Sequence, residues 1–239
     1  MSYNKNMVLL LAIVIFLLSI TGCTRNESQE KVKLDNSESA KKHNEAASNT
    51  YENIHINNYN DIVKLYNSGK KKEAEEKIKE MVKEYDEGIY EMAQGYILFK
   101  EKNYEEALIK YEKAVEKDPN LEEAYKNMVS ILILKKDFER ALTAIEEGLN
   151  RFPENTDLIF NKGQILYVQE KYEEAIKEFQ SLVAKGYHYD AYRLVGLSYM
   201  KVNDKENAIE NLNLFISKAP DEDPIKEKII ELVDSMKSE

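Results

Sequence analysis

Residues 171–175 read KYEEA, and this pattern of a charged or polar stretch that ends in alanine recurs along the chain. The other copies are KKKEA at 70–74, NYEEA at 103–107, DFERA at 137–141 and DKENA at 204–208. Their alanines are 33, 34, 34 and 33 residues apart. A fixed period of this length is typical of arrays of paired helices, in which each unit buries its apolar face against its neighbours. The spacing therefore predicts an all-α repeat fold.

Other positions recur in register with these alanines. When the alanine is numbered 20 within its unit, position 8 holds Gly95, Val129, Gly163 and Gly196. Position 24 holds Tyr111, Ile145, Phe179 and Leu212, and position 32 holds Pro119, Pro153, Tyr187 and Pro220. Small residues let two helices cross closely, so we expect positions 8 and 20 to face each other, as Gly163 and Ala175. Proline at position 32 ends the second helix, because it lacks an amide hydrogen and restricts the residue before it.

This set of residues resembles the tetratricopeptide repeat family over residues 55 to 220. The resemblance implies a right-handed α-solenoid of stacked helix-turn-helix repeats. We expect the array to occupy residues 54–220, with one degenerate repeat followed by four regular ones. In the degenerate repeat, KKEAEEKIKEMVKEY is a convincing second helix, whereas the first helix is short.

The last residues, 221–239, are expected to form a capping helix. Asp223 suits the N-cap, and Pro224 suits the first turn, where no amide hydrogen is needed. An apolar stripe runs along one side of this helix, with charged residues opposite, and consists of Ile225, Ile229, Leu232, Val233 and Met236. Such a stripe closes the open end of a helical stack.

The N-terminal sequence LLSITGC, residues 17–23, contains the only cysteine of the chain. The apolar segment before it, Met7–Ile20, spans about 21 Å as a helix at ~1.5 Å per residue, which is short for a bilayer span. The last four residues, ITGC, resemble the lipobox of bacterial lipoproteins. The resemblance implies a signal peptide at 1–22 and a diacylglycerol on Cys23. The alternative is an uncleaved signal anchor with an incidental cysteine.

The segment after Cys23 is rich in Asn, Ser, Glu and Lys and has few large apolar residues. Such a composition buries too little surface to offset its ordering entropy, so we expect a flexible tether at 23–53. A lipid on Cys23 would then place the helical domain outside the cytoplasm. The protein would be a lipoprotein on the outer face of a bacterial cell membrane or at the outer membrane.

Composition and motifs argue against several other functions. The net charge of −10 argues against nucleic-acid binding, which needs a basic face, and against docking on anionic lipid. His43, His55 and His188 are widely spaced and fit no metal or catalytic pattern, and no glycine-rich phosphate loop occurs. No catalytic dyad or triad can be named, so we expect no enzyme activity, no metal and no cofactor.

The family resemblance implies a concave groove lined by positions 2, 5, 9, 12 and 13 of the first helices. The candidate partner-binding residues at these positions are Met92, Tyr96, Phe99, Lys126, Ile133, Phe160, Gln164, Tyr167, Arg193, Leu197 and Met200, and Val168 falls on the same surface. These residues make an apolar and aromatic floor with a few cations, a composition typical of interfaces. We expect their side chains, including Phe160 and Tyr167, to contribute little to the stability of the fold.

The predicted function is that of a non-catalytic adaptor that binds a protein or peptide in this groove. Several alternatives stay open at this point. The groove residues could be ordinary core between repeats, or be covered by the tether or by a second copy of the chain in a structural homo-oligomer. A more specific role would be as a component of an envelope assembly machine, in outer-membrane barrel assembly or type IV pilus biogenesis. The sequence selects neither.

Overall fold

The computed structural model describes residues 57–81, 87–186 and 189–238. Cys23, the expected signal peptide and the expected tether lie outside these residues, as do Tyr187 and the three histidines. The described residues form α-helices joined by turns, with no strand among them, which confirms the all-α prediction. No helix within these ranges is long and apolar enough to cross a membrane.

The chain divides into two compact units, residues 1–86 and 87–239, and the first is described here by itself. The helical residues 57–67 precede α3 (Lys71–Met81). Ile62 and Ala74 are fully buried, and Lys77 on α3 forms an ion pair with Asp61 on the preceding helix. The second helix predicted for the degenerate repeat is therefore present, and the residues before it are helical as well.

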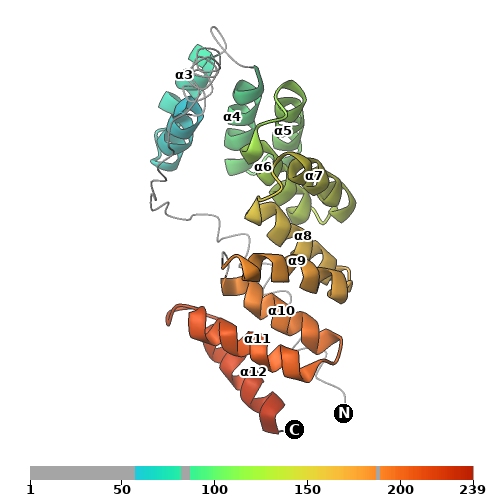
Figure 1. Ribbon diagram of the computed structural model, residues 1–239. Coiled ribbons are helices and arrows are strands. Elements are labelled where there is room, and N and C mark those ends of the chain that lie inside the picture. The colour runs from blue at the N-terminus through green and yellow to red at the C-terminus, as the bar shows by residue number, and fades with distance from the viewer. Residues whose placement is uncertain (1–56, 82–86, 187–188, 239) are drawn as a thin grey trace, which may run out of the picture. The chain divides into compact units, whose positions relative to one another are not determined.

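The second unit is a stack in which each helix packs against the next along the chain (Figure 1). Its helices are α4 (Glu87–Lys100), α5 (Tyr104–Lys117), α6 (Glu122–Leu134), α7 (Phe138–Arg151), α8 (Thr156–Val168), α9 (Tyr172–Ala184), α10 (Tyr189–Lys201), α11 (Lys205–Lys218) and α12 (Lys226–Ser238). The even-numbered helices α4 to α10 begin four pairs, and the odd-numbered helices α5 to α11 complete them. The first helix α6 also contacts the first helices α4 and α8, so first helices lie next to one another.

Three prolines lie where the register places the ends of second helices. The helices α5, α7 and α11 end two residues before Pro119, Pro153 and Pro220. This confirms the reason for proline at position 32, because the helix stops before the residue that has no amide hydrogen.

The two helices of each pair are joined by a turn of constant geometry. Lys102, Lys136, Glu170 and Asn203 occupy the same place in successive turns, with φ between 59° and 64°. In each turn the amide of this residue and the next amide donate to carbonyls in the last turn of the first helix, as in a Schellman cap. The left-handed conformation costs an L-residue roughly 1–2 kcal/mol. In the first unit a glycine, Gly69 with φ 83°, takes this place and avoids the strain.

The close contact within three of the helix pairs joins position 8 of the first helix to position 24 of the second helix. A Cβ built on Gly163 would lie 2.6 Å from Cε1 of Phe179, and all three of its nearest atoms belong to that ring. The glycine at position 8 therefore accommodates the large side chain at position 24. Gly95 with Tyr111, and Gly196 with Leu212, repeat this contact. The expected approach of position 8 to position 20 is seen at Gly196, where an added Cβ would lie 3.1 Å from the backbone oxygen of Ala208, and for Gly163 and Ala175 it stays a prediction.

One pair has no glycine at position 8. This pair has Val129 at position 8, and its position 24 holds Ile145, which is smaller than Tyr or Phe. Both side chains are fully buried. Leu212, which faces Gly196, has the same size as Ile145, so the Val129 and Ile145 pair places more volume at these positions than the Gly196 and Leu212 pair does.

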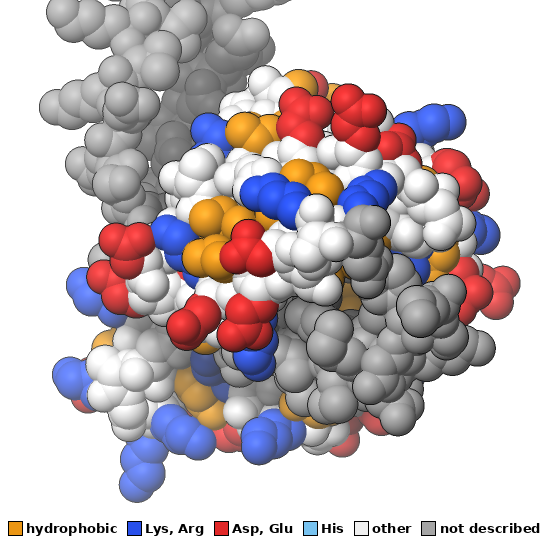
Figure 2. Space-filling model, turned by 90° about the horizontal axis from the view of Figure 1, so that it is seen from below, with side chains coloured by type: hydrophobic (Ala, Val, Ile, Leu, Met, Phe, Trp, Pro, Cys, Tyr) orange, Lys and Arg blue, Asp and Glu red, His pale blue; other side chains and the backbone are white. Residues whose placement is uncertain are grey.

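The helix α12 packs on α11, and the five residues of its predicted apolar stripe are buried. Asp223 starts it, since its Oδ1 accepts a hydrogen bond from the amide of Ile225 at 2.9 Å. Pro224 lies in the turn between them, two residues before the assigned start of the helix, a difference within the usual uncertainty of helix ends. Figure 2 views the molecule from this end, where charged side chains of both signs surround small apolar patches. A polar outer face is what a terminal element of a stack requires.

Substitutions at Gly163 and Phe179 test this contact. Gly163→Val should lower the free energy of unfolding by about 1–3 kcal/mol, because its side chain overlaps the Phe179 ring. Adding Phe179→Ile recreates the Val129 and Ile145 pair, so urea denaturation should show a coupling of about 0.5–3 kcal/mol between the two changes. As a control, Gly163→Val combined with the exposed Ile109→Ala should be additive. Additive losses for the first pair would contradict the assigned contact.

Candidate functional site: a groove along the first helices

The predicted groove residues lie on α4, α6, α8 and α10, and contacts join those of neighbouring repeats. The ammonium group of Lys126 on α6 lies 3.7 Å from Oδ2 of Asp157 at the start of α8. The hydroxyl of Tyr167 at the end of α8 is close enough to Arg193 on α10 for the guanidinium charge to affect its pKa. The structure thus brings side chains predicted from separate repeats onto one surface.

Burial divides the predicted residues into two groups. Half-buried side chains, which are partly open to solvent, are Phe99, Lys126, Ile133, Phe160, Gln164 and Met200. Buried side chains are Met92, Tyr96, Tyr167, Arg193 and Leu197. Val168, at the end of α8, is 47% exposed, one of the highest values for a large apolar residue in the described part of the chain.

The aromatic residues belong partly to the core, which corrects the expectation that they contribute little to the fold. Phe160 makes an edge-on contact with the fully buried Phe179, with ring centres 5.8 Å apart. Tyr167 is only 9% exposed, and its ring packs edge-on against Tyr172 at 5.3 Å, across the turn from α8 to α9. These rings stabilise their own repeats through burial and edge contacts.

The cations of the groove are neutralised by neighbouring carboxylates. Lys126 forms ion pairs with Glu123 and Asp157. Arg193 donates from Nε and Nη2 to the two oxygens of Asp190, at 2.6 and 2.8 Å. Both cations were predicted on the groove, but their pairs with these acids were not. The three-residue spacing of Glu123 to Lys126 and of Asp190 to Arg193 is the signal that identifies them, since such residues are neighbours on a helix surface.

Burial and nearby charges act in opposite directions on the pKa values of Tyr167 and Lys126. Burial raises the pKa of Tyr167 to about 12, and the charge of Arg193 offsets only part of this effect, so the hydroxyl stays protonated at neutral pH. Burial lowers the pKa of Lys126, but the carboxylates of Glu123, Asp157 and Glu122 together outweigh it, so the pKa is raised overall. Lys126 therefore remains charged in the groove.

Arg193 is the most buried charge of the groove. Its side chain is 3% exposed, and its Cζ lies 5.9 Å from the ring centre of Phe215 on α11. Within the described residues Nη1 has no hydrogen-bond partner. Its bidentate pair with Asp190 and the aromatic face beside it compensate most of the desolvation of the guanidinium.

The arrangement offers apolar contact and charge pairs rather than a reaction centre. Among the described residues, no group of three or more His, Cys, Asp or Glu side chains is arranged to hold a metal ion. The half-buried side chains on neighbouring first helices make a surface suited to an extended or helical segment of another chain. The fold is that of an all-α helical repeat protein, and the half-buried residues lie on its first helices.

Comparison with known proteins identifies the family of this chain. Models of the tetratricopeptide repeat match residues 90–121 and, with a second model, residues 135–191 and 160–223. The chain belongs to the tetratricopeptide repeat family. Its members are generally non-catalytic scaffolds, and their repeats indicate a role in protein–protein interaction. No curated protein matches the chain significantly.

Solved structures show the same fold. A tetratricopeptide repeat protein from Parabacteroides merdae is 20% identical, with a TM-score of 0.62 over 77% of this chain and 73% of that one. Residues 41 to the end of MamA from Desulfovibrio magneticus RS-1 are 22% identical, with a TM-score of 0.57 over 64% and 85%. YrrB, described as a repeat protein with an unusual peptide-binding site, is 19% identical, with a TM-score of 0.58 over 81% and 97%.

The burial of the groove aromatics leads to a stability prediction. Phe160→Ala and Tyr167→Ala should each lower the free energy of unfolding by about 2 kcal/mol or more, since each removes packed apolar surface and leaves a cavity. Val168→Ala, next to Tyr167 but half exposed, should change it by less than about 0.5 kcal/mol. Urea denaturation monitored by circular dichroism measures all three. Equal, small effects would mean that the rings are free groove residues after all.

Proposed function

We propose that this protein is a membrane-anchored adaptor outside the cytoplasm, which binds a protein or peptide partner in the groove along its first helices. The observation that carries the binding role is the half-buried apolar surface on α4, α6, α8 and α10, within a family whose repeats mediate protein contacts. The anchor rests on the sequence alone, namely the ITGC motif and Cys23 behind a short apolar segment.

The open members of the groove are the proposed contact residues. Phe99, Ile133, Phe160, Gln164 and Met200 are half-buried, and Val168 is more exposed, so each offers surface to a partner. Met92 and Leu197 are buried and offer little surface to a partner. Because Lys126 and Arg193 already pair with acids of the same surface, the partner is bound mainly through apolar contact.

Two exposed apolar residues provide a matched test. Val168 lies on the groove and Ile109 lies on the second helix α5, and their exposed fractions are 47% and 50%. Val168→Lys should place a charge in the apolar contact and reduce co-purification of the native partner at least about tenfold, a loss of 1.4 kcal/mol. Ile109→Lys carries the same charge change and should retain the partner. Equal recovery with both variants would place the binding surface elsewhere.

The anchor has an independent test. Cys23→Ser removes the thiol that would receive the diacylglycerol, so the protein should lose metabolic labelling with palmitate and should leave the membrane fraction. One acyl chain binds a membrane only marginally and two bind it stably, so the loss should be nearly complete. If the N-terminal peptide of the wild-type protein carries no acyl mass, the anchor proposal is wrong.

A further inference from the structure

A second concave surface lies between second helices, away from the groove described above. It is a hollow of about 840 Å³ between α5 and α7, with α6 as its floor. The floor side chains Tyr125, Met128 and Leu132 are buried, and Val115 and Ala144 extend the apolar lining up the two walls. This volume lies within the range of about 300–1,000 Å³ that ligand sites occupy.

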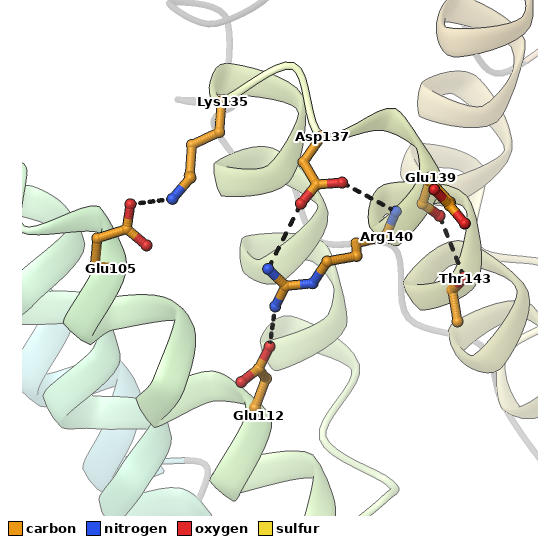
Figure 3. A network of polar contacts seen from close by, with 7 residues as sticks. All are labelled: Glu105, Glu112, Lys135, Asp137, Glu139, Arg140 and Thr143. Atoms are coloured by element: carbon orange, nitrogen blue, oxygen red, sulfur yellow. Dashed lines mark hydrogen bonds and ion pairs between the residues drawn. The ribbon is translucent and has the colours of Figure 1, made fainter.

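Ion pairs link α5 to the next repeat, which consists of α6 and α7 (Figure 3). Lys135, which follows α6, pairs with Glu105 near the start of α5. Two turns further along α5, Glu112 accepts a hydrogen bond from Nη2 of Arg140 on α7 at 2.5 Å, and Arg140 also pairs with Asp137. Each of these acids of α5 therefore has a cation from the next repeat.

The next turn of α5 breaks this series. Glu116 lies there and lines the hollow, but the facing wall presents Ala144 and Glu147 instead of a cation. Within the described residues neither Glu116 nor Glu147 forms an ion pair, and both are exposed. Of the two cations that line the hollow, Arg140 is already paired and Arg151 bonds to the hydroxyl of Tyr125. Lys117, which follows Glu116 in the sequence, pairs with Glu87.

The fold does not require these two acids. The positions equivalent to Glu116 and Glu147 at the following junction, between α7 and α9, are Asn150 and Ser181. At the junction between α9 and α11 they are Ala184 and Leu214. Repeats therefore pack at these junctions without carboxylates at the two positions. The acid pair belongs to this hollow alone among the three junctions.

We propose that the hollow between α5 and α7 is a second docking site, which takes a Lys- or Arg-bearing peptide segment of a protein partner. The aliphatic stem of such a side chain packs on the apolar floor, as long cationic side chains do on apolar surfaces. Its charged end lies between Glu116 and Glu147 and supplies the cation that the series of ion pairs lacks there. This site does not depend on the groove along the first helices.

Defined peptides test the proposal on the full chain in a non-ionic detergent, with detergent alone as the blank. The probes are two fluorescein-labelled hexapeptides, one alternating leucine with lysine and one alternating leucine with glutamate. Fluorescence anisotropy should show binding of the lysine peptide only. Glu116→Gln with Glu147→Gln should weaken this binding about tenfold or more, because it removes both carboxylates that face the ammonium group.

Two control variants distinguish binding in the hollow from general attraction to acidic surface and from binding in the groove. Glu210→Gln with Glu231→Gln makes the same change in net charge at exposed acids elsewhere, and should weaken binding less than about twofold, since charges beyond the Debye length are screened. Val168→Lys alters the groove and should leave binding unchanged. Equal weakening by the two acid pairs would show general attraction to an acidic surface and overturn the proposal. Loss with Val168→Lys alone, or no binding of the lysine peptide, would also overturn it.

Discussion

The contact between position 8 of each first helix and position 24 of each second helix sets the spacing on which the stack depends. In three pairs a glycine receives the larger side chain at position 24, and the fourth pair has Val129 and Ile145, both fully buried, at these two positions. A side chain added at Gly163 would overlap the Phe179 ring, so the helices would have to separate. The glycine at position 8 therefore sets how closely the two helices of these three pairs can approach.

The turn that joins each pair reinforces this constraint. Its length is constant, and four L-residues adopt a left-handed conformation there despite the strain. The bonds from the turn amides to the last carbonyls of the first helix offset part of that strain and satisfy groups that a helix end leaves unpaired. The turn and the contact between positions 8 and 24 together determine where each first helix lies relative to its second helix. They therefore determine where the groove residues of that first helix lie.

Much of the fold follows from the sequence because backbone packing recurs at a fixed spacing. The alanines, the small residues at position 8 and the prolines each reflect a steric requirement that repeats with the period. The left-handed residues do not follow, because Lys102, Lys136 and Glu170 have no side-chain feature that indicates this conformation. Their conformation comes from the turn length. The contact of Gly163 with Phe179 was missed, although positions 20 and 24 are one helical turn apart and lie on the same face of the second helix.

The functional surfaces were predicted less completely, for a related reason. Family positions identify which residues face the groove, but not that Phe160 and Tyr167 also pack against Phe179 and Tyr172. The hollow between α5 and α7 depends on the gap between two second helices and on side chains that differ from one junction to the next. A periodic pattern contains no information about such differences.

The central claim is that the groove along the first helices binds a protein partner, and photo-crosslinking in the native cell tests it most directly. Benzoylphenylalanine would replace Val168 on the groove and, in a parallel strain, Ile109 on α5. The account predicts a discrete adduct from position 168, with the mass of a second protein, and none of that mass from position 109. An adduct from position 109 alone would contradict the account, and an adduct with the mass of two copies of this chain would show a homo-oligomer instead.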